Sequence, residues 1–170
     1  MKTLYLLRHA KAEPASSKGE DIDRKLAPRG REACGTIGEY MKRKNYHPGL
    51  VLCSAAARTH ETFELVMEAA GLSPKHIFEK DLYYCSAEEI ITRLHDIEDE
   101  VDSVMIVGHN PVMHHLALVM AQPVSSDLHA ELELKYPTGS LTVLRFAEGS
   151  WADVRPGSGE LADFVTPSGS

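Results

Sequence analysis

Short apolar runs that end abruptly in polar residues constrain the fold of this chain most. The run at 103–107 is followed at once by Gly108-His109-Asn110-Pro111, and the predicted strand at 3–8 ends at Arg8-His9. Neither run alternates cleanly between apolar and polar residues, which is typical of strands buried on both faces of a parallel sheet. The sequence therefore predicts a layered α/β fold.

Helical patterns alternate with the predicted strands. The strands are expected at 3–8, 50–53, 77–78 and 103–107, with a terminal hairpin of 140–146 and 151–154. The helices are expected from Pro28 to about Lys44, from an N-cap at Ser54 to Gly71, after a capping box of Ser86 and Glu89, and after Asn110 as N-cap with Pro111 in the first helical position. Repeated strand–helix units predict a three-layer sandwich, in which helices flank a mainly parallel central sheet with antiparallel terminal strands.

A single domain accounts for all of these elements. It spans residues 1–155, and a tail rich in Gly, Pro and Ser follows at 156–170, which we expect to be extended or partly ordered. Within the domain, residues 11–25 are polar and charged and predict a long surface loop. Loops of this length are often functional.

The charge balance restricts the partners of the chain. Lys and Arg number 18 against 25 Asp and Glu, which gives a net charge of −7 over 170 residues. This excess disfavours nucleic acid and anionic membranes as main partners, so any anion site must be local. The chain reaches Arg8 before a signal-peptide core forms, and three widely spaced cysteines favour reduced thiols. We expect a cytoplasmic protein that binds neither nucleic acid nor membrane.

Three predicted strands end in residues that suit a phosphate group. Arg8 and His9 follow the first strand, Arg58 lies just after the second, and His109 follows the strand at 103–107. Because the carboxyl ends of parallel strands meet at one edge of a sheet, we expect these four side chains to surround one point. Two guanidiniums offer forked donors to phosphate oxygens, and a helix N-terminus beside His109 also favours an anion. Together they predict a local anion clamp.

Two histidines inside such a clamp can take two different roles in phosphoryl transfer. One would be neutral with a free lone pair, its pKa depressed by the arginines, while the other donates to the transferring group. This chemistry requires no metal or cofactor, and we expect none. A metal site is the alternative suggested by His109, His114 and His115, but on a helix the last two point about 100° apart, so at most one could join His109.

Four motifs occur in a fixed order along the chain. They are Leu7-Arg8-His9-Ala10-Lys11-Ala12-Glu13, Asp21-Ile22-Asp23-Arg24-Lys25-Leu26 with Gly30, Ser54-Ala55-Ala56-Ala57-Arg58-Thr59-His60-Glu61-Thr62, and Val107-Gly108-His109-Asn110-Pro111. Together they resemble the histidine phosphatase superfamily and, more narrowly, its small SixA-type phosphohistidine phosphatases. The resemblance covers almost the whole chain, including Pro137-Thr138-Gly139, and implies a phosphoglycerate mutase-like fold.

The resemblance also implies roles for individual residues. His9 is the implied nucleophile that becomes phosphorylated, and Arg8, Arg58 and His109 would bind and stabilise the phosphoryl group. Asn110 is a further expected substrate-binding residue. His60 and Thr62 are expected at most to orient Arg58.

Two positions depart from the family pattern. Ala10 stands where Gly commonly follows the nucleophile, and Tyr84 stands where mutase-like members carry a Glu that acts as general acid. A missing acid matters for phosphate esters, because an alkoxide leaving group needs a proton. Four carboxylates whose position the sequence does not fix are other sources of an acid: Asp21, Asp23, Glu88 and Glu89.

The missing acid favours a phosphoramidate substrate. The ring of a phosphohistidine can already carry a proton, so its P–N bond can break without a dedicated carboxylic acid. We therefore expect hydrolysis of phosphohistidine on a protein partner. The alternatives are a general small-molecule phosphomonoesterase of the same superfamily and a catalytically weak module that binds phosphate or phosphoproteins.

Overall fold

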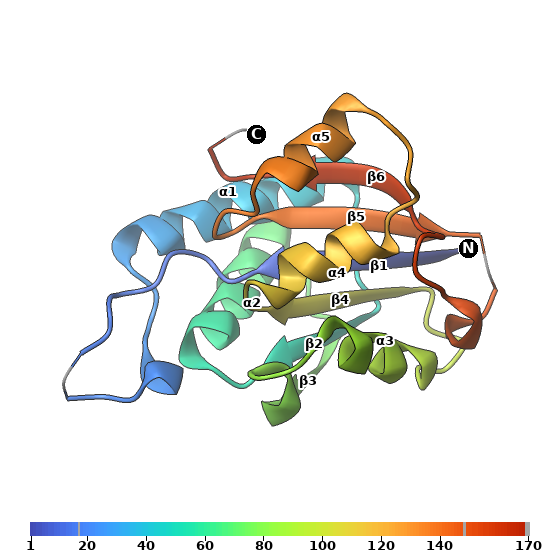
Figure 1. Cartoon of the computed structure of the whole chain (residues 1–170). Coiled ribbons are helices and arrows are strands. Elements are labelled where there is room, and N and C mark those ends of the chain that lie inside the picture. The colour runs from blue at the N-terminus through green and yellow to red at the C-terminus, as the bar shows by residue number, and fades with distance from the viewer. Residues whose placement is uncertain (17, 148, 169–170) are drawn as a thin grey trace.

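The computed structural model describes residues 1–16, 18–147 and 149–168, and its centre is a single six-stranded sheet (Figure 1). The strand order is β3-β2-β4-β1-β5-β6. The strands are β1 (Lys2–Arg8), β2 (Leu50–Ser54), β3 (Lys75–Glu79), β4 (Ser103–Gly108), β5 (Leu141–Phe146) and β6 (Glu160–Val165). The first four are mutually parallel, whereas β5 runs antiparallel to both β1 and β6. This arrangement confirms the predicted mainly parallel sheet with antiparallel terminal strands.

Helices cover both faces of the sheet and complete the three layers (Figure 1). One face carries α1 (Pro28–Lys44) and α2 (Ala57–Ala70), and the other carries α3 (Ala87–His95), α4 (Val112–Met120) and α5 (Asp127–Leu134). Alternate residues of β1 serve the two layers, since Tyr5 and Leu7 join one apolar cluster while Leu4 and Leu6 join the other. All four are buried, which explains why the strand shows no apolar–polar alternation.

Several helix boundaries follow the local sequence signals. The helix predicted from Pro28 to Lys44 has those bounds. Gly71 ends α2 in the left-handed conformation, with φ of 72°. At the start of α3, Ser86 and Glu89 form the predicted capping box.

Two predicted N-caps are wrong. Ser54 is the last residue of β2, and α2 begins at Ala57 with Ala56 as its N-cap. Likewise α4 begins at Val112 with Pro111 in the N-cap position, one residue later than expected for Asn110. In both cases tertiary contacts engage the polar side chain, because Ser54 contacts His109 and the Asn110 amide reaches the Tyr136 carbonyl.

The end of the chain also differs from the prediction. The segment predicted as a strand at 151–154 is a short 3-10 helix, Trp151–Asp153, in which the buried Trp151 Nε1 donates to the Val101 carbonyl. The second hairpin strand is β6, inside the segment predicted as a tail at 156–170. Leu161 and Phe164 pack on the core there, so the sheet extends past residue 155. Residues 169–170 of that predicted tail, and residue 17 of the predicted loop, lie outside the described residues.

Candidate active site

The two site histidines come from neighbouring parallel strands. The register of β1 and β4 places Arg8 beside Gly108, and the His9 N–H donates to the Gly108 carbonyl at 3.1 Å. His9 and His109 therefore leave the sheet side by side, with ring centroids 5.5 Å apart. Both residues are more than nine-tenths buried. The predicted meeting of these strand ends is present in the structure.

The orientation of His9 leaves one ring nitrogen available. Its Nδ1 lies 2.7 Å from the Ala10 carbonyl oxygen, and because a carbonyl only accepts, Nδ1 carries the proton. The lone pair is then on Nε2. Burial lowers the pKa of His9 most, the hydrogen bond to Ala10 opposes this shift, and the charges of Arg8 and Arg58 add to it. The resulting pKa is about 4, so the ring is neutral near pH 7. The sequence predicted this direction but named only the arginines as its cause.

The backbone around His9 is fixed by the Gly139 amide, which donates to the carbonyls of Arg8 and His9 at 3.2 and 2.9 Å. Gly139 has φ of 79°, and a Cβ atom at this position would lie 2.8 Å from Pro167 Cγ. Only glycine fits this turn without strain. The motif Pro137-Thr138-Gly139 thus supports the loop that carries His9.

Arg58 reaches the site from the first turn of α2, as its sequence position predicted. The guanidinium is buried, and its terminal nitrogens donate to the Asp21 carbonyl at 2.8 Å and to Asp21 Oδ2 at 3.0 Å. Arg8 uses one terminal nitrogen to bind the Tyr136 carbonyl at 2.8 Å. Each arginine keeps donors that these contacts do not use.

Unpaired nitrogens are concentrated at this site. Within the described part of the chain, the buried side-chain nitrogens without a hydrogen-bond partner are Arg8 Nε, Arg58 Nε and His109 Nδ1. Buried polar groups in a folded protein are almost always paired. Three unpaired nitrogens, on the last residue of β1, the residue after β4 and the first turn of α2, therefore indicate a binding site. All three suit the oxygens of a phosphoryl group.

The proton of His109 is assigned through Ser54. Ser54 Oγ lies 2.7 Å from His109 Nε2 and also accepts a weak hydrogen bond from the Ala56 N–H at 3.4 Å. Ser54 is fully buried, and among the hydrogen bonds of the described residues His109 Nε2 is the one acceptor available to its hydroxyl proton. We therefore assign that proton to this bond, which leaves the ring proton on Nδ1. Burial, and after it the neighbouring His9 ring and the charge of Arg58, lower the pKa of His109 to about 3. His109 is therefore a neutral donor through Nδ1.

Tyr83 is a site residue that the sequence did not reveal. Its hydroxyl donates to Asp21 Oδ2, its ring meets His109 edge-on at 5.4 Å, and the Arg58 guanidinium lies 5.8 Å from its centroid. Hydrogen bonds from Tyr83 and Arg24 hold the pKa of Asp21 well below its usual range. Asp21, one of four carboxylates considered as an acid, is thus ionised at neutral pH.

Thr62 connects the nucleophile loop to the helix that carries Arg58. Its Oγ1 accepts from the Ala10 N–H at 3.0 Å and donates to the Arg58 carbonyl at 2.7 Å. The same Ala10 residue accepts the bond from His9 Nδ1. The structure gives Thr62 a larger role than the sequence suggested, whereas His60 pairs with Glu64 and stacks on Phe78.

Asn110 fixes the backbone next to the site through two hydrogen bonds. Its Nδ2 donates to the Tyr136 carbonyl at 3.0 Å, the acceptor that Arg8 also uses, and its Oδ1 accepts from the His114 N–H at 3.3 Å. Asn110 also lines the cavity beside the site. Its role in substrate binding stays a prediction.

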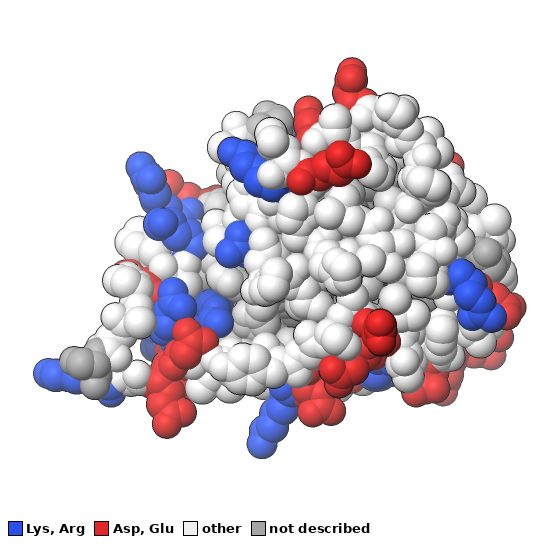
Figure 2. Space-filling model, viewed as in Figure 1, with Lys and Arg blue, Asp and Glu red and all other residues white. Residues whose placement is uncertain are grey.

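A cavity of about 700 Å³, which we call the catalytic cavity, is lined by Arg58 and His109, whereas Arg8 and His9 are not among its lining residues. Its walls come from the loop at 11–25, the segment before α3 and the start of α4, and they include Asp21, Arg58, Tyr83, Tyr84, Ser86, Glu88, His109, Pro111, Val112 and His115. In Figure 2 basic side chains gather toward the loop end of this face, and acidic ones gather along its lower edge. Among the described residues that line the cavity, Arg58 is the one Arg or Lys, and the carboxylates of Asp21 and Glu88 line it as well.

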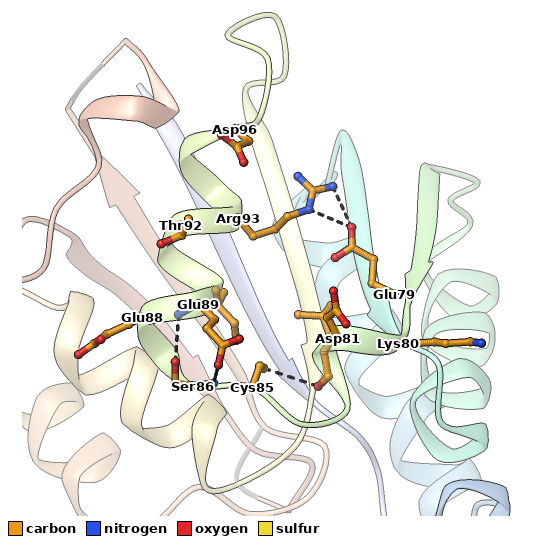
Figure 3. A pocket seen from close by; sticks show the side chains of 12 residues that line it. Glu79, Lys80, Asp81, Cys85, Ser86, Glu88, Glu89, Thr92, Arg93 and Asp96 are labelled. Carbon is orange, nitrogen blue, oxygen red and sulfur yellow. Dashed lines mark hydrogen bonds and ion pairs between the residues drawn. The ribbon is translucent and has the colours of Figure 1, made fainter.

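A second cavity of about 770 Å³ adjoins the first along α3 and shares Cys85, Ser86 and Glu88 with it (Figure 3). Arg93 pairs with Glu79 across it at 2.8 Å. Glu89 is committed to the capping box, while the Glu88 side chain points away from the Arg93–Glu79 pair (Figure 3).

The alternative of a metal site gains no support from the described residues, among which no group of three His, Cys, Asp or Glu side chains could hold an ion. His114 is committed elsewhere, since its Nε2 lies 2.6 Å from the Leu132 carbonyl oxygen. None of the helices in the described ranges is long and apolar enough to cross a membrane.

Comparison with known proteins identifies the family. Residues 4–82 match the model of the histidine phosphatase superfamily (branch 1). A solved structure from Agrobacterium tumefaciens, reported as a candidate phosphohistidine phosphatase SixA, is 32% identical, with 98% of each chain covered and a TM-score of 0.82. The chain belongs to the histidine phosphatase superfamily.

A second solved structure agrees with this assignment and places the chain near the SixA-type members, and a mycobacterial relative matches over almost the same length. A candidate phosphohistidine phosphatase SixA from Nakamurella multipartitia is 28% identical, with 98% of this chain and 96% of that one covered and a TM-score of 0.85. An uncharacterized protein of Mycobacterium tuberculosis is 32% identical over 163 residues, which are 95% of this chain and 99% of the relative. As a histidine phosphatase, the chain has the phosphoglycerate mutase-like fold that the resemblance implied.

Proposed function

We propose that this histidine phosphatase hydrolyses phosphohistidine on a protein, through a covalent phosphohistidine intermediate at His9. The observation that carries the proposal is the combination of a neutral His9 with its lone pair on Nε2 and three unpaired nitrogens beside it. A nucleophile and preorganised donors are what phosphoryl transfer requires of a protein.

In the first step His9 Nε2 attacks phosphorus in line with the bond that breaks. The N–P bond to His9 forms, the P–N bond to the substrate breaks, and its electron pair returns to the ring of the leaving histidine. Arg8, Arg58 and His109 hold the three transferring oxygens. In the second step the oxygen of a water molecule attacks phosphorus and forms a P–O bond, while the N–P bond to His9 breaks and its electron pair returns to Nε2. The phosphate leaves with the two water protons, one of which passes to solvent.

The leaving group is the reason for preferring a P–N bond. Asp21, the carboxylate in contact with Arg58, is held ionised and cannot donate a proton at neutral pH. A substrate imidazole that carries a proton on its second nitrogen leaves as a neutral ring and needs no acid. An alkoxide lacks this advantage.

The test is hydrolysis of a peptide that contains phosphohistidine, read as released phosphate and as acid-labile phosphoenzyme. We expect His9→Asn to abolish both signals. The matched control is His47→Gln, which changes an exposed histidine outside the site and should keep full activity. An active His9→Asn enzyme would refute the proposal.

Glu88 supports a second candidate, a phosphomonoesterase for small molecules, because its exposed carboxylate lines the catalytic cavity. If Glu88 is the general acid, Glu88→Gln should lower the hydrolysis of alkyl phosphates by about 10²- to 10⁴-fold. Under the phosphohistidine proposal, alkyl phosphates are poor substrates of the wild type and Glu88→Gln changes phosphohistidine hydrolysis little. Comparing both substrates with both proteins decides between the two.

A further inference from the structure

Tyr84 holds an unusual position at the mouth of the catalytic cavity. It lies between the short 3-10 helix Lys80–Leu82 and α3, and it is 82% exposed. It nevertheless lines the same cavity as Arg58 and His109. Tyr84 thus borders the cavity, and most of its surface is accessible to a ligand.

The ring of Tyr84 is held by its neighbour in the sequence. The centroids of Tyr83 and Tyr84 are 4.5 Å apart with a tilt of 56°, and Tyr83 in turn contacts His109 and Asp21. Two aromatic rings therefore lead from the catalytic histidine toward the solvent. Tyr84 is oriented without being buried, so its free face costs little to engage.

The direction of the reaction places the leaving group in this cavity. In-line attack by His9 requires the leaving nitrogen to lie on the far side of phosphorus, away from the buried nucleophile. The two residues Arg58 and His109 line the cavity whereas the buried His9 does not, and Pro111, Val112 and His115 at the start of α4 line it as well. An imidazole leaving group in this cavity would lie next to the Tyr84 ring.

The geometry points to Tyr84 as a specificity-determining residue, against whose ring the imidazole of the substrate phosphohistidine stacks. This inference rests on the proposed function and names the part of the substrate that the site selects. Aromatic pairs prefer stacked or edge-to-face contacts with centroids 4.5–7 Å apart, which a flat imidazole can make and an aliphatic amine cannot. Tyr84 therefore distinguishes phosphohistidine from ringless phosphoramidates.

The experiment measures the ratio of kcat/KM for a phosphohistidine peptide to kcat/KM for phosphoramidate, whose leaving group is ammonia. Tyr84→Ala should lower this ratio roughly two- to tenfold, the range that one aromatic contact provides. Tyr84→Phe keeps the ring and should retain the wild-type ratio. Tyr84→Leu keeps apolar bulk without the ring and should behave like Tyr84→Ala.

The control is Leu134→Ala, which removes an equally exposed apolar side chain on α5, outside the catalytic cavity, and should leave both substrates unaffected. An unchanged ratio in Tyr84→Ala, or a wild-type ratio in Tyr84→Leu, would overturn the stacking inference alone. Failure of the proposed function looks different: the wild type would then hydrolyse phosphohistidine no faster than His9→Asn.

Discussion

Arg58 and Asp21 are joined by two hydrogen bonds, from Nη1 to the Asp21 carbonyl at 2.8 Å and from Nη2 to the carboxylate at 3.0 Å. The long polar loop at 11–25 is thereby fastened to the arginine that is expected to bind the phosphoryl group. A bound phosphate and the Asp21 carboxylate would share one guanidinium, and two anions near one cation repel each other.

The first prediction concerns this competition. Asp21→Asn removes the competing negative charge while keeping the side chain's shape, so inorganic phosphate should inhibit the variant more strongly, with a Ki lower by roughly two- to tenfold. Product inhibition measured at fixed ionic strength gives this value. The control is Asp23→Asn: Asp21–Asp23 form a short 3-10 helix, and the exposed Asp23 carboxylate should leave the Ki unchanged. A higher Ki in Asp21→Asn would mean that Asp21 serves to position Arg58.

Thr62 should be needed for the placement of His9. Thr62→Val leaves the buried Ala10 N–H without an acceptor, which costs about 1–3 kcal/mol of stability. Ala10 then loses the bond that holds it in place, although its carbonyl must still orient the His9 ring through Nδ1. We expect kcat to fall with little change in KM. Thr62→Ser restores the hydroxyl and should recover most of the rate. If Ser and Val variants have equal kcat, the hydroxyl has no positioning role.

His9 and His109 should remain neutral in mildly acidic solution. Their pKa values are lowered to about 4 and about 3, so NMR signals of both rings should stay nearly constant from pH 8 to pH 5.5. Titration of either ring near the ordinary value of 6.5 would contradict the burial that we describe.

The same shifts affect stability. Because the folded-state pKa of His9 lies below 6.5, its contribution is fully present above that pH and is lost as the pH falls from 6.5 toward 4. One such group changes the unfolding free energy by up to about 1.4 kcal/mol per pH unit. The unfolding free energy, measured by urea denaturation at several pH values, should fall less steeply between pH 6.5 and pH 4 for His9→Asn than for the wild type.

The last strand should be essential to the fold. Phe164 lies on β6 with 8% of its surface exposed, so Phe164→Ala should lower the unfolding free energy by about 3 kcal/mol. Val124→Ala, at a position that is 59% exposed, should change it by less than about 0.5 kcal/mol. A result near zero for Phe164→Ala would mean that residues 156–168 behave as the tail that composition predicted.

Local sequence signals were sufficient to predict helix ends that depend on a residue and its nearest neighbours in the chain. Pro28, Gly71 and the Ser86–Glu89 box set helix ends because fixed φ, the left-handed conformation and side-chain capping are short-range effects. The prediction from composition was wrong at the end of the chain, because the Gly, Pro and Ser content of residues 156–170 indicated a tail although the apolar residues of β6 lie among them. Pairing with β5 and burial of Phe164 outweigh local propensity there.

The sequence by itself determined that Arg8, His9, Arg58 and His109 meet, because parallel strands place their carboxyl ends along one edge. Only the tertiary structure decided how they are held. Ser54, Thr62 and Tyr83 act across 55, 52 and 62 residues of chain, through single hydrogen bonds to His109, Ala10 and Asp21. Such contacts leave no periodic pattern in a sequence, since each depends on one atom reaching one partner after the sheet has formed.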